Sequence, residues 1–401
     1  MSRNRRRWIP AVLAPVIVAG SILGFTVQAN AAIDLPNKSA SQVLQMMNTN
    51  PDIAFSGRIV KKASMGLPPM NIVPDISQSM IDEMAKKMPK EMSDFLPKAS
   101  AQGELALALE FFAGTHTANI YVDGINKARL QVLDLLSERD YIRNGNDLWA
   151  YDAGKSLAQH SVIDEKEVKQ ADAQARLLLS LYGTKLPFDY TSPAAVADYL
   201  VNEAGKYSTI TTASDIKIAD RGAYQITITP KNNQSLVASA TIAIDAQTGL
   251  PLAARVMAVG QSTPAFEVAF ESITFETPAA SNFEFTPPAG THVVEVAALT
   301  KEDVLRELAQ APALPTESDA KAKLEELAAQ GWGAVAQIPA SAVPAQLRLL
   351  QANNSLYKEL TKPVAGGRVF TSALMNIYFA DNGDVYAGSV TVARLLEVAS
   401  Q

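Results

Sequence analysis

Short segments with alternating apolar residues, separated by turns of a few residues, most constrain what this chain can fold into. In "ELALALEFF" (104–112), Leu105, Leu107, Leu109 and Phe111 fall on one face of an extended chain. Further segments of this kind occur at 54–62, 117–122, 128–134, 138–145 and 146–161. A parallel sheet needs a crossover of about a dozen residues between strands. The close spacing therefore predicts an antiparallel meander.

Helices are predicted to interrupt this meander. Residues 164–183 follow a Ser161–Asp164 capping pattern and end at Gly183. Residues 192–205 have Ser192 as N-cap and Pro193 at the first helical position. A shorter helix is predicted at 39–50. Strands then resume at 223–230, 236–245, 250–259 and 265–276, with a hairpin turn at "DAQTG" (245–249).

The composition shifts near residue 299. Two capped helices are predicted to begin at Thr300 and at Thr316 or Ser318, and a third covers 343–354. The chain closes with a predicted hairpin of residues 368–380 and 385–392, which turns through "DNGD" (381–384). We therefore expect a main domain over 32–299, with a Met/Pro-rich insertion at 64–98, and a smaller α/β module over 300–401.

The first 31 residues have the pattern of an export signal. Four arginines at positions 3, 5, 6 and 7 precede an apolar run from Trp8 to Val27, and "ANA" (29–31) provides a small-x-small cleavage site. Pro10 and Pro15 favour cleavage. The run is about as long as a membrane span, so an uncleaved anchor is the alternative. With no cysteine in the chain, lipid anchoring through a cysteine is excluded. We expect an exported, extracytoplasmic protein of the cell envelope, periplasmic or secreted.

The charge balance narrows the choice of partners. Cleavage after residue 31 removes four arginines and no acids, which leaves 31 basic and 41 acidic residues. Such an acidic chain argues against a nucleic-acid partner and against simple electrostatic docking on an anionic membrane.

Local signatures of catalysis are missing. The three histidines (His116, His160 and His292) are far apart in sequence, and no HExxH, GxSxG, Walker or GxGxxG motif is present. Without cysteine, thiolate chemistry and zinc–thiolate sites are impossible. "DNGD" lacks the ligand spacing of a calcium loop. A triad assembled from distant positions stays open, but we expect no enzyme, no metal and no cofactor.

Three motifs in order resemble the LolA family of lipoprotein carriers and related sigma-factor regulatory proteins. The first is "RNGNDLWAYD" (143–152), the second is "IDAQTGLPLAARV" (244–256), and the third is "NFEFTPPAGTHV" (282–293). Together they correspond to the family pattern of a glycine turn with "lW.Yd", a "lD..tglP" hairpin and a closing "F.f..P.g..v". The resemblance covers roughly residues 40 to 295.

The resemblance implies an α+β fold, in which a curved antiparallel half-barrel wraps around helices and leaves an apolar pocket. It implies a carrier that binds lipid or an acylated protein. The alternative is an extracytoplasmic sensor that binds an anti-sigma factor or another membrane protein through the C-terminal module. Carrier members place Arg-Pro after the second strand. Residues 120–132 contain none, with Arg129 the only substitute, and this departure weighs against transfer to a receptor more than against lipid binding.

A row of methionines distinguishes the insertion. Met80, Met84, Met88 and Met92 recur every four residues and would form one stripe on a helix, opposite a charged side, with a kink at Pro89. The stripe could cover a core, form an adaptable lid over a pocket, or lie on a membrane or partner. The expected site residues are the apolar pocket and lid, formed by Met80, Met84, Met88, Met92, Phe95, Leu107, Leu109, Phe111, Trp149, Tyr151, Phe266, Val268 and Phe270, with Lys127 and Arg129 at a headgroup rim. Core packing is the alternative for the aromatic residues, and solvated strand charges are the alternative for the rim.

Overall fold

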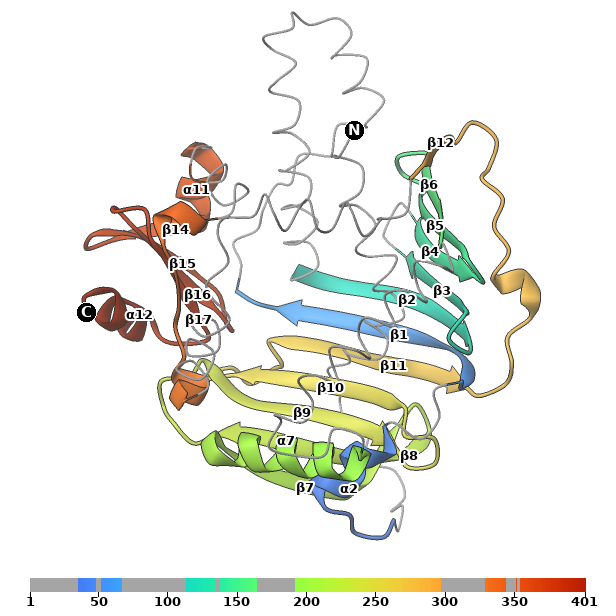
Figure 1. The fold of residues 1–401 in the computed structure, drawn as a ribbon, viewed down its shortest axis with the longest axis horizontal. Helices are drawn as coiled ribbons and strands as arrows, with labels where there is room; N and C mark the ends of the chain where they lie inside the picture. Colours follow the sequence, from blue (N-terminus) through green and yellow to red (C-terminus); the bar gives the residue numbers. More distant parts are fainter. Residues whose placement is uncertain are drawn as a thin grey trace, which may run out of the picture.

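Two β-sheets dominate the fold (Figure 1). The computed structural model describes residues 35–47, 52–66, 113–133, 138–163, 192–296, 329–343, 351 and 354–401. In this part of the chain, a 12-stranded sheet is formed by residues before 297 and a 5-stranded sheet by residues after 335.

The large sheet joins two antiparallel meanders through its first strand. The first meander runs through β2 (Ala113–Asp123), β3 (Lys127–Leu133), β4 (Glu138–Asn144), β5 (Asp147–Asp152) and β6 (Leu157–Val162). The second runs through β7 (Ser208–Ile218), β8 (Arg221–Pro230), β9 (Val237–Asp245), β10 (Pro251–Ala258) and β11 (Phe266–Thr274). β1 (Ala54–Ser64) pairs with β2 on one side and β11 on the other, and β12 (His292–Glu295) adds in parallel to β6.

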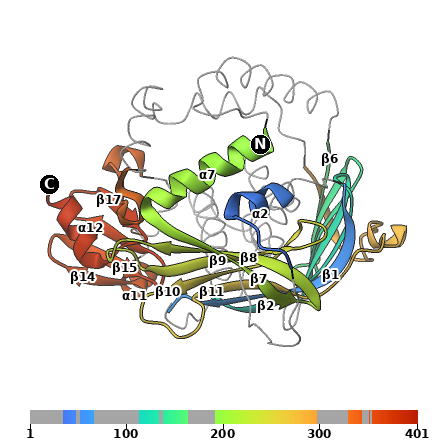
Figure 2. The same cartoon turned by 90° about the horizontal axis from the view of Figure 1, so that it is seen from below.

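The sheet is strongly curved, and two helices lie inside the curve (Figure 2). They are α2 (Ala40–Met46), capped by Ser39, and α7 (Pro193–Tyr207), capped by Ser192. Ala40 and Val43 of α2 pack against Tyr224, Ile226 and Ile244 of the sheet. We call this helix-bearing side the concave face and the opposite side the outer face.

Strand register extends the concave face across the sheet. Ile226 pairs with Ile242, Ile242 with Ala254, Ala254 with Val268, and Val268 with Lys61. Directly paired residues point to the same side of a sheet. Phe266, Val268 and Phe270 therefore share the concave face with the residues that hold α2.

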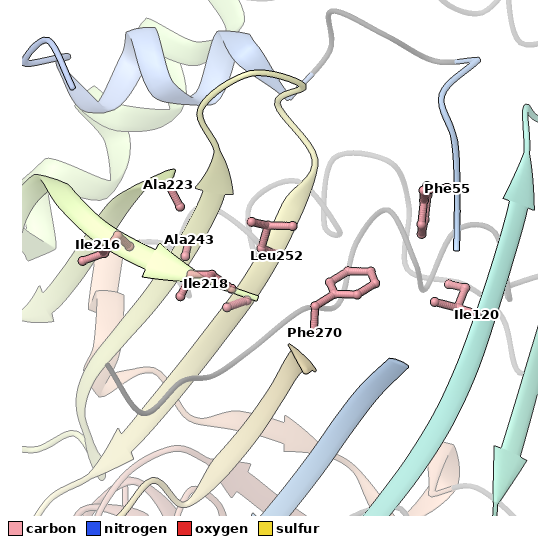
Figure 3. Packing of buried hydrophobic residues seen from close by; sticks show 9 residues of the cluster. Phe55, Ile120, Ile216, Ile218, Ala223, Ala243, Leu252 and Phe270 are labelled. Atoms are coloured by element: carbon pink, nitrogen blue, oxygen red, sulfur yellow. The ribbon is translucent and has the colours of Figure 1, made fainter. Parts of the chain in front are cut away.

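The centre of the sheet is packed where the two meanders meet (Figure 3). Phe55 of β1, Ile120 of β2 and Phe270 of β11 belong to one buried cluster, and the Phe55 and Phe270 rings meet edge to face at 5.9 Å. Gly57 is required here, because a Cβ at this position would lie 2.5 Å from the carbonyl oxygen of Ser272 and 2.9 Å from the Phe270 ring.

A segment that we call the strap (residues 275–291) connects β11 to β12 across the outer face. It includes the 3-10 turn η3 (Ala280–Asn282), which lies outside the curve in both views (Figures 1 and 2). Phe283 of the strap is 1% exposed. The strap therefore covers part of the sheet opposite the helices.

The C-terminal residues form a compact module with helices on both faces of the small sheet. Its elements are η4 (Gly331–Gly333), β13 (Ala336–Ile338), η5 (Ala340–Ala342), α11 (Asn354–Leu360), β14 (Thr361–Val364), β15 (Gly367–Thr371), β16 (Asn376–Ala380), β17 (Val385–Gly388) and α12 (Val392–Ala399). Leu395 of α12 packs with Tyr378 and Tyr386, whereas Tyr357 of α11 packs with Phe379.

This module is joined to the large sheet by backbone and side-chain hydrogen bonds. Ser235, beside β9, forms an isolated bridge with Val390, and the Leu236 amide donates to the carbonyl of Ser389 at 2.8 Å. The Ala373 amide donates to the carbonyl of Met65, just after β1, at 2.7 Å. Trp332 Nε1 donates to Ser208 Oγ at 2.7 Å.

The fold class agrees with the sequence-based expectation of a curved antiparallel sheet around helices. Three predicted elements were wrong. Residues 146–161 form two strands, β5 and β6, because residues 153–156 turn. Residues 368–380 are likewise two strands, β15 and β16. The strand predicted to reach residue 392 ends at Gly388, because Thr391 caps helix α12.

β7 was not predicted at all, because its polar residues hide the alternation. The predicted leader, the methionine row, the strand 104–112, the helix 164–183, the helices starting at 300 and 316–318, and the domain boundary at 299 lie outside the described residues. Within the described part, no helix has the length and apolar character to cross a membrane.

Candidate functional site

The concave face carries an apolar grid where β11, β1 and β2 lie side by side. Three registered rows cross these strands: Phe270–Ile59–Ala118, Val268–Lys61–His116, and Phe266–Ala63–Gly114. Phe270 is 2% exposed, whereas Phe266 and Val268 are half-buried. Apolar attraction is non-directional and scales with area. The half-buried end of the grid is therefore suited to hold an apolar chain without fixed polar partners.

Two polar side chains interrupt this grid, in its middle row. Lys61 is 8% exposed, and its Nζ donates to the carbonyl oxygen of Ala113 at 2.9 Å. His116 Nε2 lies 3.2 Å from the same oxygen. In register, Lys61 lies between Val268 on β11 and His116 on β2, with Ile59 and Ala63 as its neighbours on the concave face of β1. Lys61 is not among the site residues expected from the sequence, although alternation in "RIVKK" (58–62) requires one of the two adjacent lysines to face inward.

Trp149 and Tyr151 lie on the outer face, away from Phe266, Val268 and Phe270. Strand register places Trp149 in one row with Ile142, Arg129, Tyr121 and Ser56. Ser56 follows the inward-facing Phe55 on β1, so this row lies on the outer face. Both rings contact Phe285 of the strap, with centroid distances of 5.2 Å from Trp149 and 5.4 Å from Tyr151. The two residues therefore anchor the strap. The residues that were expected to line one pocket thus lie on two opposite faces of the sheet, so Trp149 and Tyr151 cannot share a pocket with Phe266.

His160 fastens the end of the strap. Its ring stacks on Trp149 at 4.2 Å, and its Nδ1 lies 2.9 Å from a Glu295 carboxylate oxygen of β12. Its Nε2 lies 3.1 Å from Asp147 of β5. Both ring nitrogens therefore face carboxylates, and the contact with Glu295 reinforces the pairing of β12 with β6.

Lys127 and Arg129, the expected headgroup rim, are also on the outer face. Lys127 Nζ lies 3.1 Å from Asp123 and 6.0 Å from the centre of the Phe283 ring. Arg129 Nε donates to Asp140 at 2.7 Å, and its Nη1 lies 3.4 Å from the carbonyl oxygen of Asn282. These contacts connect both cations to the strap and to acidic neighbours.

The Asp140 carboxyl is buried under this arrangement, with 2% of its side chain exposed. Burial raises the pKa of Asp140 to about 6 against the opposing hydrogen bond from Arg129, and the neighbouring Glu138 carboxyl adds to the rise. Asn119, Gln131 and Glu138 extend the polar network, with Asn119 Nδ2 donating to Gln131 and Gln131 Nε2 to Glu138. This part of the outer face is thus a polar network beneath the strap, beside the aromatic contacts of Phe285.

The other expected site residues, namely Met80, Met84, Met88, Met92, Phe95, Leu107, Leu109 and Phe111, lie outside the described residues. Among the residues that the structure does describe, no cluster of His, Asp or Glu is arranged to hold a metal ion.

In three kinds of comparison with known proteins, matches come from solved structures. No protein-family model matches this chain, and no curated protein matches it. Solved structures do match. A crystal structure of MucB is 14% identical over 62% of each chain, with a TM-score of 0.31. The Pseudomonas aeruginosa MucA/MucB complex gives 12% identity over 90% of this chain and 96% of that one, with a TM-score of 0.38.

A LolA superfamily protein, NE2245 from Nitrosomonas europaea, also matches. It is 9% identical, over 62% of this chain and 99% of that one, with a TM-score of 0.22. The solved structures that this chain resembles therefore include the family indicated by the sequence motifs.

Proposed function

We propose that this chain is an exported, non-enzymatic binding protein that holds an acyl chain, of a lipid or of an acylated protein, on its concave face. The observation that carries the proposal is the apolar grid of β11, β1 and β2. Phe266 and Val268 remain half-buried there, while α2 and α7 pack on β7, β8 and β9. The leader-like residues 1–31 support export.

The energetics allow retention without covalent chemistry. Each methylene that leaves water contributes about 0.8 kcal/mol. A chain of about sixteen carbons therefore provides roughly 13 kcal/mol, which exceeds most of the range for the cost of association, about 4–15 kcal/mol. A curved sheet offers such a chain contact along its length, and the ligand needs no fixed polar partner.

Lipid identification from the mature protein, purified from its native compartment, tests the proposal. We expect native mass spectrometry to find co-purified lipid with the wild-type chain and not with Phe266→Gln, which places an amide on the grid. Thr274→Gln, on the outer face of the same strand, is the matched control and should retain lipid. A lipid-free wild-type protein that also takes up no added fatty acid would refute the proposal.

A second candidate is a sensor that binds an anti-sigma factor or another membrane protein through the C-terminal module. The observation in its favour is the contact of Ala373 with Met65, which directly follows β1. A ligand on the β1 part of the grid would therefore lie on a strand that leads to the module.

Met375, 41% exposed on the module, offers a test of this role. An anti-sigma factor should be retained by the wild-type chain and lost with Met375→Glu, and equal retention would contradict this role.

A further inference from the structure

The strap is held to the outer face at few points. Of its residues, Phe283 alone is fully buried, and its other positions are half-buried or exposed. In the described part of the chain, a single hydrogen bond links the middle of the strap to the strands, from Arg129 Nη1 to the carbonyl oxygen of Asn282 at 3.4 Å. Segments with so few buried contacts open at a low cost in free energy. A change of charge beneath the strap can therefore shift the balance between its closed and open positions.

A buried acid lies beneath these contacts. Asp140 is on the outer face of β4, yet its side chain is 2% exposed. Its register neighbour on β5 is Tyr151, whose ring contacts Phe285 of the strap, and Arg129 links it to Asn282. The described segment over this part of the outer face is the strap, which lies outside the curve (Figures 1 and 2). The strap therefore contributes to the burial of Asp140, and opening the strap would return this carboxyl to water.

The charges of this group balance only while Asp140 holds its proton. Arg129 Nε donates to Asp140 at 2.7 Å, and Arg129 Nη2 lies 3.9 Å from Glu138. Burial raises the pKa of Asp140 to about 6, and the proton that it retains is donated to Glu138, which lowers the pKa of Glu138. Protonated Asp140 thus leaves one cation and one anion beneath the strap, whereas ionised Asp140 adds a second negative charge that burial disfavours.

The other charged groups on this side do not offset that second charge. Lys127 Nζ is 3.1 Å from Asp123 and so already has an acidic partner. Tyr121 of β2, in the same row of the outer face, adds no cation. The acids of the strap, Glu276 and Glu284, are exposed to water. Loss of the proton beneath the strap therefore favours the open position.

The far end of the strap is held by a second ionisable contact. His160 on β6 lies between two carboxylates, with Nε2 3.1 Å from Asp147 on β5 and Nδ1 2.9 Å from Glu295 on β12. A neutral imidazole has one N–H, so only the imidazolium donates to both acids. The ring also stacks on Trp149, which contacts Phe285 of the strap. Loss of the imidazolium proton therefore breaks one of the two contacts and weakens the hold on β12.

We infer that the strap is a pH-sensitive cover of the outer face, which acid holds closed and which opens as the groups beneath it lose their protons. The buried acid under its middle and the histidine at its end act in the same direction, since each holds the strap best in its protonated form. Opening uncovers Trp149, Tyr151 and Phe283, so this aromatic surface is more accessible at neutral pH than in acid. The device is independent of acyl binding, because the apolar grid lies on the opposite face of the sheet.

Hydrogen–deuterium exchange of the full mature chain tests this device. Exchange is followed by mass spectrometry at pH 5 and pH 8 and corrected for the intrinsic rate at each pH. The amides of Phe283 and His292 donate hydrogen bonds in the closed strap and at the start of β12. Their protection should fall about tenfold between the two pH values, because closed Asp140 keeps its proton up to about pH 6, whereas an exposed aspartate loses it at about 3.9. Glutamate ordinarily titrates at about 4.3, so Glu138 is ionised at both, and protection of β8 and β9 should change less than about twofold.

Two pairs of variants locate the groups. Asp140→Asn should lessen the change at Phe283, and Asp220→Asn, which alters a 94% exposed acid on the turn between β7 and β8, should keep it. His160→Gln should lessen the change at β12, and His292→Gln, which alters an exposed histidine on β12 itself, should keep it. If a variant fails to fold, as judged by circular dichroism, the wild-type comparison of the two pH values still decides.

Equal protection of the strap at both pH values, or stronger protection at pH 8, overturns the inference. A fall that extends equally to β8 and β9 overturns it as well, since the whole domain would then loosen and not the strap. A full response to pH in both folded variants, Asp140→Asn and His160→Gln, would overturn the assignment of these two groups.

Discussion

Lys61 and Lys62 are adjacent in the chain and have opposite environments on the two faces of the sheet. Lys61 points to the concave face and is 8% exposed among apolar neighbours. Lys62 points outward, and its half-exposed side chain pairs with Glu267. One residue of shift along a strand reverses the face of a side chain. The difference shows that the two faces of this sheet have different surfaces, apolar on the concave side and charged on the outer side.

The two faces are also covered by different means. The concave face has helices α2 and α7, held by apolar contacts with β7, β8 and β9. The outer face has the strap, held by the aromatic contacts of Phe285 and the hydrogen bond from Arg129 to Asn282. Apolar packing therefore stabilises one side, and a mixed polar and aromatic network stabilises the other.

The largest expected effect comes from the concave side. Phe270→Ala should lower the free energy of unfolding by about 3–5 kcal/mol, because it removes a buried ring from the contact with Phe55 and leaves a cavity. Urea denaturation of the mature chain measures the loss. Thr274→Ala, on the outer face of the same strand, should cost less than about 1 kcal/mol. Similar losses from both variants would show that the faces do not differ in packing.

An intermediate and pH-dependent effect is expected under the strap. Arg129→Ala leaves the Asp140 carboxylate buried without its cation, which should cost about 3 kcal/mol above neutral pH. The cost should shrink in acid, because protonation removes the buried charge. Urea denaturation at pH 5 and pH 8 measures both values, with Arg58→Ala, from an exposed pair, as the control that loses little at either pH.

The direction in which the stability of the wild-type chain changes with pH follows from the raised pKa of Asp140. Stability contributed by this group is fully present below the unfolded pKa, about 3.9, and is lost as the pH rises through about 6. Asp140→Asn should therefore remove this part of the pH dependence. An unchanged slope between pH 5 and pH 7 in Asp140→Asn would contradict the assignment.

The smallest effect is expected from the exposed lysine. Lys62→Met removes a half-exposed lysine from the buried Glu267, which keeps its second partner Arg255 at 3.8 Å. We therefore expect a loss of about 1 kcal/mol or less, as for a partly exposed pair. Thermal unfolding in low and high salt measures the change, which should become smaller still in high salt. A loss greater than that of Arg129→Ala would contradict the expectation that the buried pair on the outer face contributes more than the half-exposed one.

Much of the fold could be predicted because its signals are local. Alternation located β1 to β4 and β8 to β11 closely, and Ser192 with Pro193 marked the start of α7. The failures also have local causes. "STITTASDIKI" (208–218) has too few apolar residues to show a face, and the turn at 153–156 is short enough to hide inside one apparent strand.

The candidate site was less predictable, because it depends on which face of each strand turns inward. Phe266, Val268 and Phe270 were correctly grouped on one face by alternation. Trp149 and Tyr151 were also correctly paired with each other, but nothing in the sequence assigns their face relative to Phe266. That assignment requires the register of six strands, from β5 through β4, β3, β2 and β1 to β11.

The sequence by itself determined the antiparallel strands, the capped helix at 193, the turns and the absence of cysteine chemistry, because these depend on neighbours a few residues apart. Only the tertiary structure decided that β1 pairs with β11, that the strap crosses the outer face, and that Lys61 rather than Lys62 faces the apolar grid. Those outcomes depend on contacts between residues about 200 positions apart and on the direction in which the sheet curves, and no local pattern encodes either.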